Sequence, residues 1–327
     1  MKKAGQNYIS MNKILCIGEA LIDMICTDKG KSLAEGINFL KKPGGAPTNV
    51  AAAIAALGGH AAIASKVGND PFGQYMADVM KKFNVDTRFM FRDPSFFTTI
   101  AFVSLMESGE RDFVFSRGAD GQLSVEDMAL VPFNDYQIFH FGAATSFLPG
   151  PFFDAYKTSR DRALQQNAFI SFDPNYRNDL FKNNQPFFIS NSLAFIDHCH
   201  FFKLSDEEAF LLTGLHTIEA AATALMQKTK ATFTITLGGD GTLLCHDNQM
   251  EKIPSIPIKP VDTTGAGDAF VGAILYLLSQ KNAASINSLS FDEWRLMVQN
   301  ANKAGARTCE YLGAMEAFAF LNNSIFE

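Results

Sequence analysis

The sequence predicts an α/β fold whose central sheet is mainly parallel and covered by helices on both faces. Runs such as "YQIFHFGA", "NAFISFDPN" and "CHFFKLS" are typical of strands that are buried on both faces. Helical stretches such as "GPFFDAYKTSRDRALQQ" and "TIEAAATALMQKT" separate these strands. Because parallel strands need crossover connections, this alternation indicates a sheet between two layers of helices.

The N-terminal elements begin this alternation. "KILCIGEALIDMICT" predicts a first strand that begins apolar and ends in polar residues. "PGGAPTNVAAAIAALGG" predicts a glycine-rich turn followed by a helix over about 48–57. "AAIASKVG" and "DPFGQYMADVMKKFN" then predict another strand and another helix, which completes a βαβα unit.

The pattern changes over residues 98–117. Two β-rich runs are joined there by Ser-Gly-Glu, which predicts a hairpin. No helix of its own follows this hairpin to cover it. We therefore expect a small sheet that is set apart from the main one.

Polar residues close several of the predicted strands. In an open α/β sheet, ligands bind beyond the carboxyl ends of the strands, so these residues are candidates for a binding site. They are Asp23, Asp173, Asn175, Ser205, Thr236 and Gly238.

Composition excludes several classes of protein. The chain has 327 residues and a formal net charge of -6, which argues against nucleic acid or an anionic membrane as a partner. No uninterrupted apolar run is long enough for a membrane helix, and the first residues lack the apolar stretch of a signal peptide. Five scattered cysteines without C-x-x-C spacing suggest buried thiols in a reducing compartment. We expect a cytoplasmic protein, with residues 1–11 as an extension and Met11 as an alternative start.

The stretch "DTTGAGDAFVGAILYLL" at 262–278 carries the strongest chemical signal. Gly265, Ala266 and Gly267 are small, so backbone amides at the start of the following helix can approach a phosphate closely. Asp268 repels a phosphate in the ground state, so its presence suggests a task such as accepting a proton. The plainer alternative is a helix capped by Asp262 after a glycine-rich turn.

Other familiar nucleotide-binding and metal-binding motifs are incomplete or absent. "GKS" at 30–32 ends like a P-loop, but that motif requires glycine at position 25, which is Ile25. No G-x-G-x-x-G follows the first strand, which removes the main support for a dehydrogenase. His198 and His200 lack a third metal ligand nearby in the sequence. Two glycine-rich segments remain, at 44–49 and 265–268.

These two segments carry a family resemblance. "GGAPTNVAAAIAALGG", with Gly44, Gly45, Asn49, Gly58 and the later Gly68, resembles the first signature of the ribokinase-like (pfkB) carbohydrate kinases. "DTTGAGDAFVGAIL" resembles the second, and the similarity covers about 13–319. The resemblance implies a three-layer α/β/α fold with a small β-sheet lid. It implies one domain over 12–322, with the lid formed by about 22–43 and 96–118.

The resemblance also implies roles for individual residues. Asp268 would be the base that takes a proton from a sugar hydroxyl, and the amides of Gly265, Ala266 and Gly267 would form the anion hole. The residues expected to bind the sugar or its phosphate are Asp23, Gly44, Gly45, Asn49, Arg117 and Arg177.

ATP and Mg²⁺ are the implied cosubstrate and metal. The residues expected on the nucleotide side are Asn175, Lys203, Thr236, Gly238, Gly241 and Asn302. The family motif Asn-x-x-Glu appears here as "SDEE", so Ser205 replaces the asparagine, while Glu208 is retained and can order water around the magnesium. Many relatives also hold K⁺ near positions that match Asp262 and Thr264.

The motifs "GEALIDM", "GGAPTNVA", "RGAD" and "DPNYR" look most like the fructokinase branch, which implies transfer to the 6-hydroxyl of D-fructose. A 2-keto-3-deoxygluconate kinase is the nearest rival, but the matching lid positions, Ala101 and Phe115, offer no hydroxyl to a carboxylate substrate. A riboside kinase is a third alternative. A non-catalytic sugar-binding regulatory relative would be expected to lose Asp268 or the glycines. The apolar hairpin would suit a homodimer paired through the lid or an intramolecular contact, and both stay open.

Overall fold

The computed structural model describes residues 11–106, 111–142, 144–283 and 285–327. Within them, the main sheet has nine strands in the order β13-β12-β11-β10-β9-β8-β1-β4-β5. Its strands are parallel except for β12 and β13, which run antiparallel to their neighbours. Their bounds are β1 Ile14–Ile17, β4 Ala61–Gly68, β5 Met90–Asp93, β8 Ile138–Phe141, β9 Phe169–Phe172, β10 Phe201–Ser205, β11 Thr232–Thr236, β12 Thr242–His246 and β13 Gln249–Ile253.

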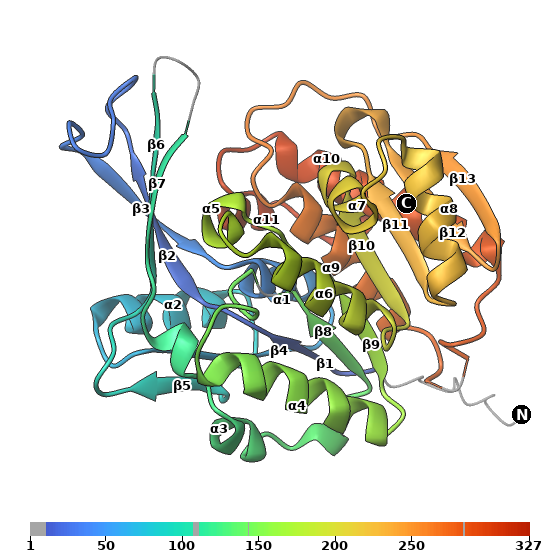
Figure 1. Ribbon diagram of the computed structural model, residues 1–327, viewed down its shortest axis with the longest axis horizontal. Coiled ribbons are helices and arrows are strands. Elements are labelled where there is room, and N and C mark those ends of the chain that lie inside the picture. Colours follow the sequence, from blue (N-terminus) through green and yellow to red (C-terminus); the bar gives the residue numbers. More distant parts are fainter. Residues whose placement is uncertain (1–10, 107–110, 143, 284) are drawn as a thin grey trace, which may run out of the picture.

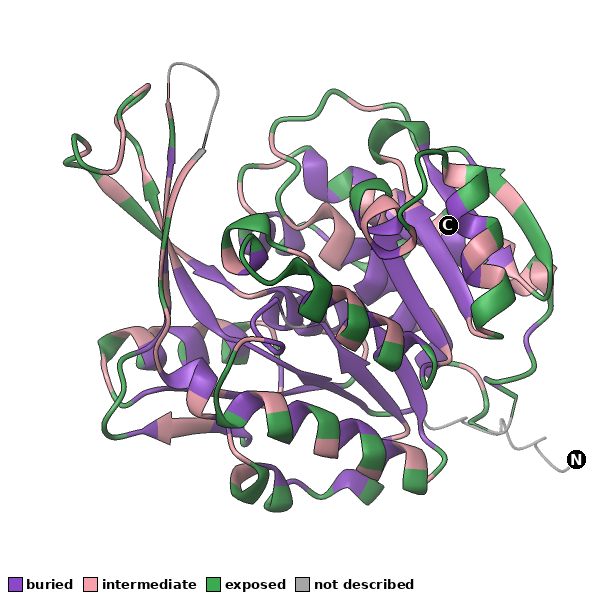
Figure 2. Cartoon of the chain, in the orientation of Figure 1, coloured by how far each residue is buried: buried purple, intermediate pink, exposed green. Residues whose placement is uncertain are grey.

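Helices cover both faces of this sheet and bury one apolar cluster on each (Figures 1 and 2). On the first face lie α1 Ala46–Ala56, α2 Pro71–Lys82, α9 Ala266–Ser279, α10 Phe291–Cys309 and α11 Ala314–Phe318. On the second lie α3 Val125–Ala129, α4 Pro151–Gln165, α5 Asn178–Phe181, α6 Gln185–Ile196, α7 Asp206–Thr213 and α8 Ile218–Lys228. The three-layer α/β/α prediction is confirmed.

Helix α9 is largely buried, as α1 is. It is apolar on nearly every side, and it packs between α1 and α10. A Cβ at Gly272 would lie 2.7 Å from the Cβ of Ala53, so this glycine allows α9 and α1 to approach closely. The packing brings the first turn of α9 beside the first turn of α1.

A second sheet of four strands projects away from the body in the order β3-β2-β6-β7 (Figure 1). Its strands are β2 Leu21–Cys26, β3 Phe39–Gly44, β6 Ile100–Leu105 and β7 Arg111–Ser116. The separate small sheet expected around the hairpin is confirmed, and we call these four strands the lid. The limits proposed for the domain stay predictions. Residues 1–10 of the extension expected at 1–11, and residues 107–110 in the hairpin, lie outside the described residues.

The first predicted strand is wrong in one respect. "KILCIGEALIDMICT" forms two strands, β1 in the main sheet and β2 in the lid. Gly18, Glu19 and Ala20 separate the two strands and are all buried, and the chain passes from there into the second sheet. Asp23 therefore lies within a lid strand and not at the end of β1. The stretch "TFTITLGGDGTLLC" contains two antiparallel strands, β11 and β12, joined by a glycine-rich turn.

By length and apolar composition, none of the described helices could cross a membrane alone, although α7 and α8 together, bent by 60°, would meet those two criteria.

Candidate active site

The anion-hole segment lies at the start of α9. Gly265 is the N-cap residue, with a φ of 80°, and a Cβ there would lie 2.4 Å from the Cβ of Ala314. Both the backbone conformation and the contact therefore require glycine. Asp268 follows in the first helical turn, where backbone amides have no partner within the helix. The amide of Ala266 donates to the Thr263 carbonyl oxygen at 3.2 Å in the preceding loop. This is the geometry of an anion-binding helix start.

Asp262 is not the N-cap of this helix, contrary to the plainer alternative from the sequence. Its Oδ1 accepts hydrogen bonds from the backbone N of Thr264 at 3.0 Å and from Thr264 Oγ1 at 2.7 Å. Its Oδ2 accepts one from the backbone N of Gly313 at 2.8 Å. Asp262 thus shapes the loop before α9 and ties it to the loop before α11.

The two glycine-rich segments meet at Asp268. Asn49, on α1, donates a hydrogen bond from Nδ2 to Asp268 Oδ2 at 2.8 Å. Asn49 is buried, while Asp268 keeps part of its surface accessible. The candidate base therefore stands beside the turn that was expected to form the floor of the sugar pocket.

The surroundings of Asp268 favour a group that can accept a proton. Burial raises the pKa of Asp268 to about 6; the Asn49 hydrogen bond opposes this shift, and the charge of Asp173 adds to it. Lys203 and Arg177 also oppose it. A carboxyl with a pKa near 6 is ionised at neutral pH yet more basic than an ordinary aspartate.

Lys203 is a buried cation in the interior of the same site. Its Nζ lies 3.2 Å from Asp173 Oδ2, and both side chains are almost fully buried. Although burial lowers the pKa of Lys203, the charges of Asp173, Glu208 and Asp268 raise it above the usual value. A Cβ at Gly267 would lie 3.4 Å from Lys203 Nζ, which places this ammonium group next to the anion-hole segment.

Asp23 reaches the site from the lid. A Cβ at Gly44 would lie 2.2 Å from Asp23 Oδ2, so the glycine leaves the space that this carboxylate occupies. Burial raises the pKa of Asp23 to about 6, and the charge of Arg177 opposes the shift. The charge of Arg177 thus lowers the pKa of both Asp23 and Asp268.

Four residues, one on each lid strand, are paired across the lid sheet. Asp23 pairs with Lys42 on β3 and with Ala101 on β6, and Ala101 pairs with Phe115 on β7. Side chains at paired positions point to the same face of a sheet. Ala101 and Phe115 therefore share the face that carries Asp23.

Arg117 already has partners within the protein. Its guanidinium donates hydrogen bonds to the carbonyl oxygens of Pro149 at 2.5 Å and Thr145 at 3.2 Å, and it lies 3.6 Å from Asp120. In this structure Arg117 holds the 145–149 loop, and its contact with substrate stays a prediction.

Most residues predicted on the nucleotide side lie at the carboxyl ends of β9, β10 and β11 or in the turn that leads from β11 to the start of the antiparallel β12, and Asn302 lies on α10. Asn302 accepts a hydrogen bond from Thr242 Oγ1 at 2.7 Å and donates to the carbonyl oxygens of residues 253 and 254. Thr236 donates to the Leu204 carbonyl at 3.2 Å. Asn175, with a φ of 52°, donates to the Gly142 carbonyl at 3.4 Å. These side chains fix the loops around the site.

Gly238 and Gly241 shape the turn between β11 and β12. Their φ values are 57° and 102°, in the region that favours glycine. A Cβ at Gly241 would lie 2.2 Å from the Ile253 carbonyl oxygen, whereas nothing lies within 4 Å of one at Gly238. The turn at Gly238 therefore leaves room beside its backbone.

Glu208 is buried at the start of α7. Its Oε1 accepts from the backbone N of Tyr176 at 2.7 Å, and its Oε2 from that of Ser205 at 2.8 Å. Ser205 is the N-cap, and its hydroxyl accepts from the Glu208 amide in a reciprocal capping box. Over the described part of the chain, no three His, Cys, Asp or Glu side chains gather closely enough to hold a metal. Magnesium fits this site only through water and phosphate oxygens, which is its usual mode of binding.

Two buried acids lie near the site without a signal in the sequence. Glu19 accepts a hydrogen bond from the Ala46 amide at 3.3 Å, at the start of α1. Among the described residues, Glu19 Oε2 and Asp120 Oδ2 have no hydrogen-bond partner. Burial raises the pKa of Glu19 to about 8, with backbone donors opposing the shift and Asp120 adding to it. Only the folded chain shows that Glu19 is buried.

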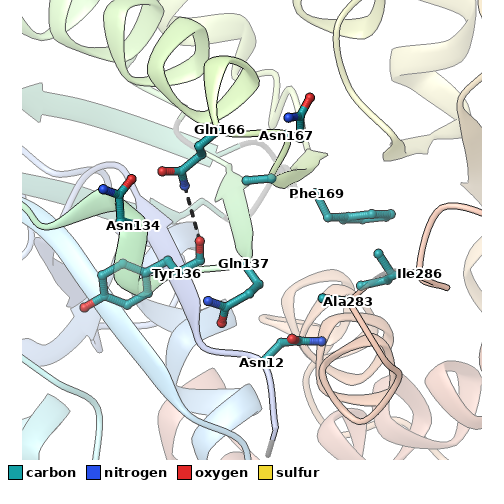
Figure 3. Close-up of a pocket in the computed structure, with 10 residues that line it drawn as sticks. Asn12, Asn134, Tyr136, Gln137, Gln166, Asn167, Phe169, Ala283 and Ile286 are labelled. Carbon is teal, nitrogen blue, oxygen red and sulfur yellow. Dashed lines mark hydrogen bonds between the residues drawn. The ribbon is translucent and has the colours of Figure 1, made fainter.

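A cavity of about 300 Å³ lies at the opposite, amino edge of the sheet (Figure 3). Its lining includes the carboxamides of Asn12, Asn134, Gln137, Gln166 and Asn167, and none of the residues that line it carries a charge. None of the residues predicted for the active site borders this cavity.

Comparison with known proteins identifies the family of this chain. The model of the pfkB family carbohydrate kinases matches residues 11–319. Fructokinase-1 of Zea mays is 36% identical over 307 residues, which span 92% of this chain and 93% of that protein. A fructokinase of Vibrio alginolyticus is 34% identical over 316 residues, spanning 94% of this chain and 96% of that one.

Solved structures of similar proteins hold ligands. The fructokinase of Xylella fastidiosa, with bound ATP, superposes with a TM-score of 0.83 at 30% identity and covers 96% of both chains. A double mutant of the Vibrio cholerae O395 fructokinase, with fructose, ADP and potassium, gives 0.79 at 30% identity over 97% of both. An E. coli protein described as a ribokinase II, with ATP and Mg²⁺, gives 0.81 at 26% identity over 97% of this chain and 98% of that one.

Proposed function

We propose that this chain, which belongs to the pfkB family of carbohydrate kinases and is similar to fructokinases, transfers the γ-phosphoryl group of ATP to the 6-hydroxyl of D-fructose. The hydrogen bond between Asn49 and Asp268 carries this proposal. The bond supports the proposal because it holds the carboxylate of Asp268, the proposed proton acceptor, beside the turn at 44–49.

In the proposed reaction, the sugar oxygen bonds to the γ-phosphorus while the bond between that phosphorus and the oxygen of the departing ADP breaks. Asp268 takes the proton of the hydroxyl as the oxygen attacks. The amides of 265–267 and the nearby Lys203 stabilise the charge on the transferred group. This division of labour suits phosphoryl transfer, in which positioning and charge neutralisation supply most of the catalysis.

Asp23 and Arg177 are the proposed orienting groups for the sugar. Asp23 would accept hydrogen bonds from sugar hydroxyls over the floor formed by Gly44, Gly45 and Asn49. Phe115 and Ala101 share its face of the lid and add no hydroxyl or charge. A neutral sugar is therefore favoured over a carboxylate such as 2-keto-3-deoxygluconate, whose charge these two positions would leave unpaired.

ATP and Mg²⁺ are the proposed cosubstrate and metal, as in the similar structures that hold them. Magnesium bound to the ATP phosphates lowers their negative charge when present. Glu208 would contact it through water. A potassium site near Asp262 and Thr264 is proposed by similarity to the Vibrio cholerae enzyme.

Two further expectations accompany the proposal. The lid exposes apolar side chains on its strands, at Ile25, Leu40, Leu105 and Val114. Pairing of two copies through this surface stays a prediction, as does a cytoplasmic location.

A substrate panel tests the proposed function. Purified protein would be assayed with ATP and fructose, 2-keto-3-deoxygluconate or aminoimidazole riboside, and the product position assigned by ³¹P and ¹³C NMR. We expect kcat/KM for fructose to exceed the others by about 100-fold, because the wrong ligand leaves polar groups unpaired, and we expect the 6-phosphate as product. Preference for the acid or the riboside, or phosphate on another hydroxyl, would contradict the proposal.

A further inference from the structure

Among the described residues, one ion pair joins the lid to the body of the protein. Lys42, on the edge strand β3, pairs through Nζ with Glu316 Oε1 on α11, and the two residues lie 274 positions apart. Their side chains are 17% and 44% exposed. Lys42 stands opposite Asp23 in the lid sheet and two residues before Gly44, so it belongs to the part of the lid that borders the proposed sugar site.

Glu316, the acidic partner of this ion pair, lies on a helix that contacts the anion-hole loop. Gly313 directly precedes α11 and donates its amide hydrogen to Asp262 at 2.8 Å. Ala314, the first residue of α11, fills the space beside Gly265 where a Cβ would lie 2.4 Å away. Glu316 therefore stands on a short helix that is packed against the N-cap residue of α9.

Gly313 leaves room for the ion pair. Its φ is 86°, and a Cβ there would lie 2.4 Å from Glu316 Oε2 and 3.4 Å from Lys42 Nζ. Either constraint disfavours a larger residue. The ion pair and the hydrogen bond to Asp262 thus meet at one residue.

The opposite face of β3 is also held. Lys41 Nζ lies 3.8 Å from the ring centroid of Tyr75 on α2, a cation–π contact. Adjacent residues of a strand point to opposite faces. Lys41 and Lys42 therefore hold β3 between α2 and α11.

We propose that Lys42 and Glu316 are positioning residues that keep Asp23 and Gly44 at the correct distance from the anion hole. The role rests on the proposed function, because it assumes that the sugar is held by the lid and phosphorylated at 265–268. An exposed ion pair contributes little to stability by itself. Its effect is expected in geometry, because small displacements between reacting groups reduce the rate strongly.

A double-mutant cycle tests this role with Lys42→Met, Glu316→Gln and the double variant. Each single change should lower kcat/KM for fructose about tenfold while the KM for ATP and the melting temperature stay near the wild-type values. The double variant should lose no more than either single one, because both break the same link. Lys42→Arg keeps the charge and should retain most of the activity.

Lys281→Met is the matched control, since it breaks a partly exposed pair with Glu293 remote from the site; its activity should not change. Additive losses would mean that the two residues act independently. A loss for Lys42→Met with none for Glu316→Gln would mean that Lys42 acts on the sugar directly. Either result would overturn the inference. Amide hydrogen exchange over 39–44 needs no substrate and should be faster in both single variants. Failure of the wild-type enzyme to phosphorylate fructose would refute the proposed function. Unchanged amide hydrogen exchange over 39–44 in the single variants would refute only the role of the ion pair.

Discussion

The carboxyl and amino edges of the main sheet are both polar, but they differ in charge. At the carboxyl edge, Lys203 lies 3.2 Å from Asp173 and next to the anion-hole segment. Burial raises the pKa of Asp268, whereas the neighbouring acids raise that of Lys203 in spite of its burial. At the amino edge, the cavity in Figure 3 is lined by carboxamides and apolar groups. Convergent charges in a partly buried setting indicate catalysis better than a hollow polar surface does.

The amides of the amino edge have a structural explanation. Gln166 donates to the carbonyl oxygens of Phe133 at 3.0 Å and Tyr136 at 3.3 Å. Asn12 donates to that of Lys281 at 2.8 Å. Such contacts satisfy backbone groups where the strands begin. At the carboxyl edge, by contrast, burial raises the pKa of Asp268, and it also raises that of Asp23 on the lid strand β2.

The largest expected effect is at Asp268. Asp268→Asn should lower kcat by roughly 10² or more, because the amide cannot accept the proton. Binding of ATP, measured by calorimetric titration, should change little. If this variant turned over at the wild-type rate, Asp268 would not be the base, and the carboxyl edge of the sheet would no longer be distinguished from the amino edge as the catalytic one.

A smaller effect is expected at Glu19, near the carboxyl edge. The pKa of its carboxyl is raised by folding, so the folded protein holds this proton more tightly than the unfolded chain. The resulting stability is complete at pH values below the ordinary pKa and is lost as the pH rises through about 8. Wild-type protein should lose unfolding free energy over this range, with a slope of up to about 1.4 kcal/mol per pH unit.

Glu19→Gln should remove this part of the slope, and urea unfolding at several pH values would measure it. Parallel curves for wild type and variant would show that Glu19 titrates normally in the folded protein.

The smallest effect on turnover is expected at the amino edge. Gln166→Leu removes the two hydrogen bonds to the backbone and should reduce the unfolding free energy by about 1–3 kcal/mol. Steady-state kinetics should remain within about twofold of wild type, since changes remote from the site usually leave transition-state contacts intact. A loss of turnover comparable to that of Asp268→Asn would show that this cavity takes part in function.

Much of the site was predictable because its signals are local. The glycines at 44–45 and 265–267 permit backbone conformations and close contacts that other residues do not, and Asp268 follows them directly. The alternation of apolar strands and amphipathic helices predicted the three layers. The split of the first strand was missed because a single buried glutamate gives no periodic signal.

The sequence by itself determined the order of strands and helices, the two glycine-rich turns and the acid beside the second one, since these depend on neighbouring residues. Only the tertiary structure decided that Asn49 contacts Asp268, 219 residues away, and that Lys42 meets Glu316. It also decided the pKa values of Glu19, Asp23 and Asp268, because burial and charge at a position depend on which distant segments pack around it.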